Sequence, residues 1–203
     1  IDKVKEQCDD MANLAKENIS LCLEFVKLYS SENDAKIREN EKKLDTFEDE
    51  LETYLVKISS MDLGINDSVK LSKLTHAIGN FERIGDYATN FDELAEKMST
   101  TNVTFSETAR KELDILSDAV HEIIHLTIDA LEKEDDEAAR LIEPLEEVID
   151  DMIMILKDRH TKRLKKGECT VDTGLVFMEC LTYLERASDH CSSIAVMMLG
   201  RKD

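Results

Sequence analysis

The chain has 203 residues, enough for one or two ordinary domains with a buried core. Its 45 acidic side chains outnumber its 26 Lys and Arg, so the formal net charge is -19, which repels nucleic acid phosphates and anionic membrane faces and attracts cations and basic proteins. One Pro, six Gly and 42% hydrophobic residues exclude a disordered acidic tail and a turn-rich sandwich or barrel, and they favour long helices.

Apolar residues recur at helical spacing along almost the whole chain, with a break at residues 30–33 and a polar stretch at 99–103 between the halves. Thr104 with Glu107 has the pattern of a capping box and predicts the start of the fourth helix. Pro144, in the fifth helix, should either kink that helix or mark its true start. The pattern predicts six long helices: 4–28, 37–58, 69–98, 105–133, 136–165 and 172–199.

The second half of the chain repeats the first. An offset of 105 residues aligns Glu41 with Glu146, and after one loop an offset of 103 aligns Glu82 with Glu185. A duplicated three-helix unit is expected to form two antiparallel bundles side by side. The predicted fold is therefore all-α, with two tandem, pseudo-symmetric three-helix bundles over residues 1–100 and 101–203.

Five Cys without paired spacing indicate a reduced, cytosolic protein. The longest apolar runs are far shorter than the roughly 18 to 20 residues that span a bilayer, and we recognise no signal peptide. The sequence opens at Ile1 and not at Met, which suggests a piece of a longer protein.

Each predicted repeat carries two Glu-x-x-x-Asp pairs, whose members share a helix face beside the apolar stripe. Two such faces on neighbouring helices would bring four carboxylates together, an arrangement that is costly unless a divalent or trivalent cation compensates the charge. In so acidic a chain about ten pairs of acids of either kind stand four residues apart by chance, so a solvated acidic face is the alternative. Recurrence at matching places favours metal binding. The pairs are Glu41/Asp45, Glu82/Asp86, Glu146/Asp150 and Glu185/Asp189.

Residues 82–90 read Glu-Arg-Ile-Gly-Asp-Tyr-Ala-Thr-Asn, and their partial copy at 185–190 reads Glu-Arg-Ala-Ser-Asp-His. This stretch resembles the signature of PhoU-domain proteins, and the resemblance covers essentially the whole chain as two repeats of three helices. Residues 52–59 resemble the subgroup that is fused behind sodium/phosphate cotransporters.

The resemblance implies a regulator of phosphate uptake and signalling, not an enzyme, that binds iron or zinc at its Glu-x-x-x-Asp motifs. Because Ala187 and Ser188 replace the Ile-Gly of the first motif, we expect the first site to bind metal more tightly than the second. The implied metal ligands are Glu41, Asp45, Glu82 and Asp86 in the first site, and Glu146, Asp150, Glu185 and Asp189 in the second.

On this basis we expect the cytosolic C-terminal domain of a sodium-dependent phosphate cotransporter, tethered to the cell membrane through an upstream transporter domain. Its partner would be that membrane domain or another phosphate-regulon protein; neither nucleic acid binding nor membrane insertion of this segment is expected, and a homo-oligomer stays open. The alternatives are a stand-alone PhoU-type accessory regulator and a metal-free helical scaffold, with a metalloenzyme as the least favoured class.

Two further patterns contain histidine. Residues 121–125 spell HExxH, the helix motif of zinc proteases, but such enzymes also need a sheet and a cleft, which this composition does not support. The overlapping Glu122-x-x-His125 is a single pair, whereas di-iron bundles use two. His190, beside Asp189, is an additional candidate ligand.

Overall fold

The computed structural model describes residues 2–25, 31–101 and 103–200, with the side chains of 23–25 and 31–32 left out. All the regular secondary structure of this described part is helical, without a strand, which confirms the predicted all-α class. None of its helices combines the length and apolar content that a membrane span requires. The helices are α1 (Asp2–Phe25), α2 (Ser31–Ser59), α3 (Ile65–Thr101), α4 (Glu107–Lys133), α5 (Asp136–Ala139), α6 (Ile142–Lys165) and α7 (Val171–Met198).

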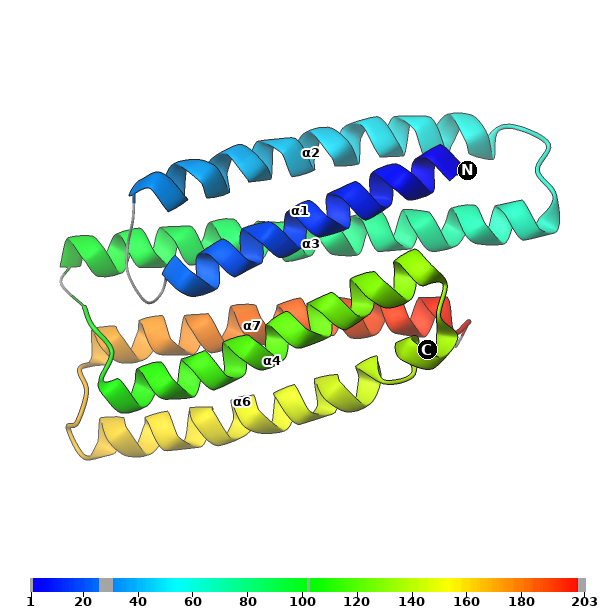
Figure 1. Cartoon of the computed structure of the whole chain (residues 1–203). Helices are drawn as coiled ribbons and strands as arrows, with labels where there is room; N and C mark the ends of the chain where they lie inside the picture. The colour runs from blue at the N-terminus through cyan, green and yellow to red at the C-terminus, as the bar shows by residue number, and fades with distance from the viewer. Residues whose placement is uncertain (1, 26–30, 102, 201–203) are drawn as a thin grey trace.

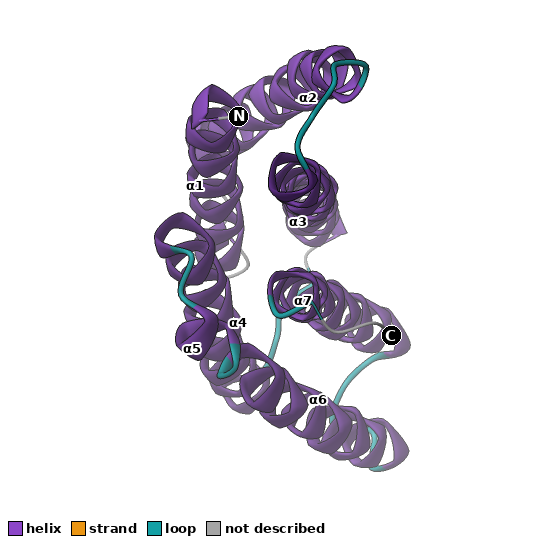
Figure 2. Ribbon diagram, turned by 90° about the vertical axis from the view of Figure 1, so that its right-hand side faces the viewer, coloured by secondary structure: helices purple, strands orange, loops and turns teal. Residues whose placement is uncertain are grey.

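The helices form two antiparallel bundles that lie side by side, α1 with α2 and α3, and α4 with α6 and α7 (Figure 1). Viewed along the helices, α2, α1, α4 and α6 follow an arc, and α3 and α7 lie next to each other inside it (Figure 2). The two bundles meet where α1 packs against α4 and where α3 packs against α7. The Glu82/Asp86 pair on α3 and the Glu185/Asp189 pair on α7 therefore lie on the two helices that pack across the boundary between the repeats.

Apolar side chains at helical spacing make a continuous core through both bundles. Phe81, Phe91 and Phe177 are essentially fully buried. Burying a side chain of this size stabilises the fold by about 1.5–3 kcal/mol relative to leaving it in water. The α3–α7 boundary is also aromatic, because the rings of Tyr87 and Tyr183 stack with their centroids 6.1 Å apart.

The predicted fifth helix is divided in the structure. The short α5 ends at Ala139, and α6 begins at Ile142, so Pro144 lies in the first turn of α6. Proline is tolerated there because the backbone N–H that it lacks would have no helical partner in any case. Pro144 therefore does not kink a continuous helix; it marks the true start of one.

Other predicted boundaries were wrong by a few residues. The fourth helix is capped by Ser106, whose Oγ accepts a hydrogen bond from the backbone N–H of Ala109 at 3.2 Å, so the predicted Thr104 and Glu107 capping box does not form. The first turn of α2 occupies part of the predicted break, from Ser31 onward, and α3 runs into the predicted polar linker as far as Thr101. Polar residues are compatible with the extension of α3 because residues 99–101 are exposed on the surface of a long helix.

Candidate metal centre

The acidic residues of the first repeat come from two helices that pack against each other. Glu41 and Asp45 lie on α2, and Glu82 and Asp86 lie on α3. Gly85 is buried between the two acids of α3, where an added Cβ atom would collide with the Cδ1 of Leu44 on α2. The missing side chain lets α2 and α3 approach closely. The glycine of the motif therefore helps to bring its two acids near those of α2.

The carboxylates of the first repeat are close enough for the charge of one to raise the pKa of another. Burial, then the negative charges of Asp86 and Glu48, raises the pKa of Glu82 to about 7. Burial, then Asp45 and Asp86, also raises the pKa of Glu41. Glu48, one turn beyond Asp45 on α2, belongs to the same group, and its pKa is raised by burial first and then by neighbouring acids. Without a cation, the first cluster favours partial protonation near neutral pH.

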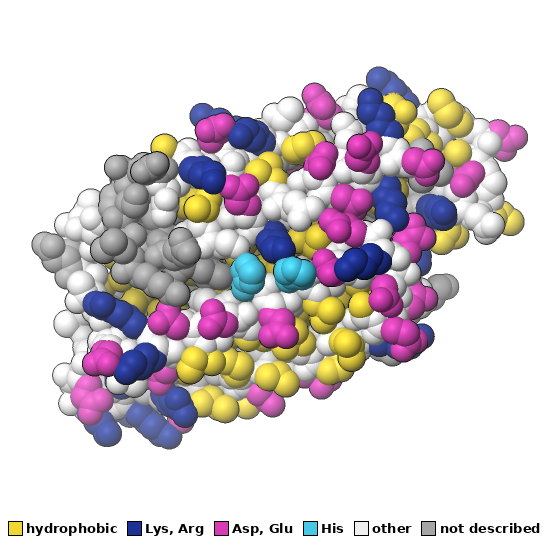
Figure 3. All heavy atoms as spheres, viewed as in Figure 1, with side chains coloured by type: hydrophobic (Ala, Val, Ile, Leu, Met, Phe, Trp, Pro, Cys, Tyr) yellow, Lys and Arg dark blue, Asp and Glu magenta, His cyan; other side chains and the backbone are white. Residues whose placement is uncertain are grey.

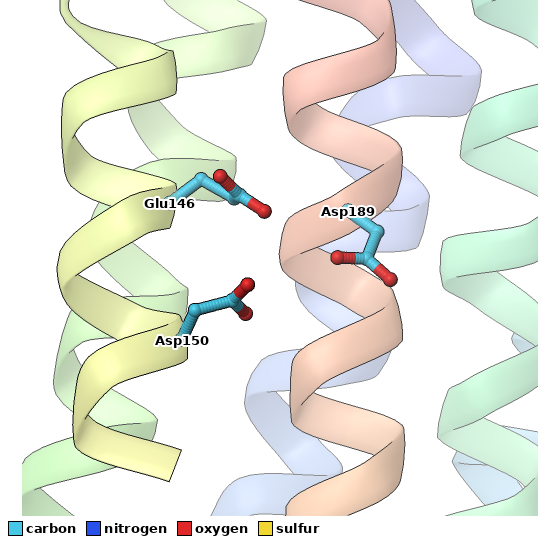
Figure 4. Close-up of side chains that lie close together, drawn as sticks. All are labelled: Glu146, Asp150 and Asp189. Carbon is cyan, nitrogen blue, oxygen red and sulfur yellow. The ribbon is translucent and has the colours of Figure 1, made fainter. Parts of the chain in front are cut away.

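In the second repeat three carboxylates converge. Glu146 and Asp150 extend from α6 toward Asp189 on α7 (Figure 4). Each offers one oxygen, and the three oxygens lie within 4.8 Å of one another. Burial, followed by the charge of a neighbouring acid, raises the pKa of all three. Glu146 is half-buried while Asp150 and Asp189 are exposed, so a cation can reach the group from solvent.

Glu185, the fourth implied ligand of the second repeat, is engaged by a lysine. Its Oε2 lies 2.7 Å from the Nζ of Lys157, one helix away on α6. Sequence analysis missed Lys157 because no spacing in the chain connects the two residues, which are brought together only by the packing of α6 on α7. This ion pair places a positive charge beside the acids, and it leaves three carboxylates, those of Glu146, Asp150 and Asp189, for a cation.

The two repeats differ in how closely their acids are assembled. Within the described residues, Glu146, Asp150 and Asp189 are the one set of three clustered side chains that could hold a metal ion. In the first repeat, the charge of Asp86 acts on Glu82 from one turn away on the same helix. The geometry therefore favours the second cluster as the better assembled one, although its flanking residues depart further from the motif.

The donor atoms of both clusters are carboxylate oxygens. Such donors fit hard cations and iron, and they also occur as ligands of zinc. His190, the additional candidate beside Asp189, directs its Nδ1 to the Oδ1 of Asn80 on α3, 2.8 Å away. Burial, then the positive charges of Arg83 and Arg186, lowers the pKa of His190. His190 thus links the two repeats through its Nδ1. The acids of each cluster form a donor set of oxygen atoms only.

Arg83 and Arg186 follow the glutamates of the two motifs. The Nε of Arg83 lies 3.7 Å from an oxygen of Glu82, and its charge lowers the pKa of that acid, although burial and the other carboxylates outweigh it. The side chain of Arg83 is largely exposed. Since solvent weakens such pairs, this one contributes little to stability.

Comparison with known proteins agrees with this arrangement of two repeats. The PhoU domain family matches residues 8–95 and 113–198, so the chain belongs to the PhoU domain family. It is 23% identical over 195 residues to a phosphate-specific transport system accessory protein PhoU homolog of Synechocystis, covering 95% of this chain and 85% of that protein. It is 21% identical over 192 residues to a PhoU homolog 1 of Thermotoga maritima, with 94% and 82% covered.

Solved structures show the same fold. PhoU from Pseudomonas aeruginosa superimposes with a TM-score of 0.91 at 17% identity, covering 98% of this chain and 94% of that one. The phosphate transport system regulatory protein PhoU from Streptococcus pneumoniae gives a TM-score of 0.86 at 14% identity, covering 97% and 92%. These matches extend over nearly the full length of both bundles.

Proposed function

We propose that the chain is a non-enzymatic accessory regulator of phosphate transport that acts in the cytosol on a component of a phosphate transport system. The observation that carries the proposal is the convergence of Glu146, Asp150 and Asp189 in a two-repeat PhoU fold. Both curated relatives carry names that describe accessory proteins of phosphate-specific transport, and both are matched over more than four fifths of their length.

A bound cation is part of this proposal. Glu146, Asp150 and Asp189 would hold it in the second repeat, and Glu41, Asp45, Glu82 and Asp86 would hold it in the first. Iron or zinc is the expected metal by family resemblance, and the raised pKa values of these acids fit a site that gains from positive charge. When bound, the metal would supply positive charge and Lewis acidity on a surface whose net charge is -19. The acids of α6 and α7, and those of α2 and α3, would be joined through the cation in an arrangement that a partner could recognise.

The cytosolic tail of a sodium/phosphate cotransporter is the second candidate. Its support is the resemblance of residues 52–59, on α2, to the transporter-fused subgroup. The curated relatives favour the accessory protein instead, because both are named as accessory proteins. The two readings differ in the partner, which is a component of a phosphate-specific transport system in the first and a sodium/phosphate cotransporter membrane domain in the second.

Phosphate uptake in cells tests the regulatory role. Deleting the gene should remove the dependence of uptake on external phosphate, and the parent chain should restore it. The double variant Asp150→Asn, Asp189→Asn should fail to restore it, whereas the control Glu137→Gln, Asp172→Asn removes two exposed acids of the same repeat and should succeed. Unchanged uptake after deletion would contradict the regulatory role, and full restoration by the first variant would contradict the role of the cluster.

The partner is identified by cross-linking in the same cells followed by purification of the full chain. Recovery of a membrane component of a phosphate-specific transport system is the expected result. Recovery of a sodium/phosphate cotransporter would establish the second candidate instead.

A further inference from the structure

The HExxH segment is not used by the carboxylate clusters. It lies in the middle of α4, where His121 and His125 are separated by one helical turn. Residues four apart share a face, with their Cβ atoms about 5–6 Å from each other. His121 is half-buried and His125 is 52% exposed, so both imidazoles are accessible from solvent. The local structure thus presents two accessible nitrogen donors on one face of a rigid helix.

The histidines belong to a shallow depression on the molecular surface. Figure 3 shows histidine side chains, in cyan, lying together between α1 and α4, with acidic side chains nearby. Leu126 is the one apolar residue of the lining, and the other members are polar or charged. The lining residues are Asp118, His121, Glu122, His125, Leu126 and Asp129.

Asp129 is the carboxylate that lies beside His125. Its Oδ1 lies 3.6 Å from the Nδ1 of His125, and its Oδ2 lies 2.6 Å from the Nζ of Lys133. The lysine holds the carboxylate, whose Oδ1 lies just beyond hydrogen-bond distance of the His125 imidazole. A metal-binding histidine characteristically donates its second N–H to a carboxylate, and a small movement of the His125 ring would allow this with Asp129 and leave Nε2 as the metal donor.

We propose that His121 and His125 form a second kind of metal site, a two-imidazole site for a borderline transition metal such as Zn²⁺, Ni²⁺ or Cu²⁺. Imidazole suits these ions, whereas the oxygen-only clusters suit harder ones. Asp129 is a positioning residue, and water completes the coordination sphere. The proposal does not depend on the proposed function, because it uses α4 residues outside both Glu-x-x-x-Asp clusters.

The surroundings favour metal binding over the peptide hydrolysis that HExxH suggests. In the part of the chain that the structure describes, His121 and His125 belong to no set of three clustered ligands, whereas a zinc protease supplies three. The depression is shallow and lies along a surface helix, without a substrate cleft between sheet and helix. Glu122, which would be the general base of a protease, is exposed on the helix surface.

Nickel distinguishes this site from the acid clusters, because imidazole binds it well and carboxylates alone bind it poorly. The full chain, freed of metal by a chelator, is titrated with Ni²⁺ by calorimetry. The parent should take up one equivalent at this site, and His121→Gln and His125→Gln should each weaken that binding by more than about tenfold. Asp129→Asn should weaken it less, and it should shift the imidazole ¹⁵N resonances of His125 that report which nitrogen carries the proton.

Two controls make the test decisive. His76→Gln removes an exposed histidine from α3, and Asp172→Asn removes an exposed acid from α7; both should leave nickel binding unchanged. Circular dichroism verifies that each variant is folded. Equal nickel affinity in the parent and in the His121 and His125 variants, or equal loss in His76→Gln, would overturn the proposal without touching the phosphate-regulation proposal.

Discussion

Asn80 on α3 and His190 on α7 connect the two repeats through a hydrogen bond of 2.8 Å between Asn80 Oδ1 and His190 Nδ1. The amide Nδ2 of Asn80 donates to the backbone carbonyl of His76, also at 2.8 Å, so the Oδ1 faces the histidine as an acceptor. The ring of His190 stacks near Tyr87, with centroids 5.9 Å apart. A directional polar contact therefore sets the register of the antiparallel α3–α7 boundary.

Replacing Asn80 by Leu should destabilise the protein by about 1–2 kcal/mol, because the half-buried Nδ1–H of His190 loses its acceptor. The measurement is the free energy of unfolding in urea at pH 7.5. Asn66→Leu is the control, since Asn66 is exposed at the start of the same helix. Equal stability of the two variants would mean that the contact does not hold the repeats together.

Glu82 should make the metal-free protein less stable as the pH rises. Its folded pKa is about 7, above the ordinary 4.5, so the folded state holds a proton that the unfolded state releases between those values. The contribution of this group to stability is complete below about 4.5 and is lost as the pH rises through about 7. Glu82→Gln should therefore stabilise the chelated protein at pH 8 by an amount on the order of 1 kcal/mol.

The measurement for Glu82 is a series of thermal melts from pH 5 to pH 8 in the presence of chelator. Glu50→Gln is the control, because Glu50 is an exposed acid of α2. A pH dependence that is the same in the parent and in Glu82→Gln would show that Glu82 carries no excess proton in the folded state.

Metal should raise the melting temperature of the chelated protein, since a cation that binds only the folded state stabilises it by about 2.7 kcal/mol at a hundred times its dissociation constant. Asp189→Asn should reduce this shift more than Asp86→Asn, because the oxygens of the second cluster already lie within 4.8 Å. Melts with iron, zinc and magnesium measure the shift. If no metal shifts the parent, the acids are a solvated face and the scaffold interpretation is correct.

Two glycines of α3 should respond oppositely to the same substitution. Gly79→Ala meets no atom within 4 Å and should stabilise the helix by about 0.5–1 kcal/mol. Gly85→Ala collides with Leu44 and should destabilise the fold by about 1–3 kcal/mol. Unfolding in urea gives both values, and each variant serves as the control for the other. Similar stabilisation by both would show that the Leu44 side chain can move aside without cost.

Much of the architecture can be read from the sequence because it is encoded locally. Apolar residues at helical spacing bury one face of each helix, so the long helices are predictable without tertiary information. The four Glu-x-x-x-Asp pairs are likewise visible in the chain, because residues four apart share a helix face. The helix boundaries were less accurate: the start of α6 near Pro144 and the Ser106 cap depend on which of several polar residues finds a backbone partner.

The composition of the site was decided by the packing of helices. Lys157 is 28 positions from Glu185, and their ion pair exists because α6 and α7 pack together. Asn80 and His190 are 110 positions apart, and their contact depends on the register of α3 against α7. The sequence by itself determined the helices, the duplication and the identity of the acids, since these follow from local periodicity. Only the tertiary structure decided which acids converge, because carboxylate separation depends on interhelical distance and rotation, and local spacing constrains neither.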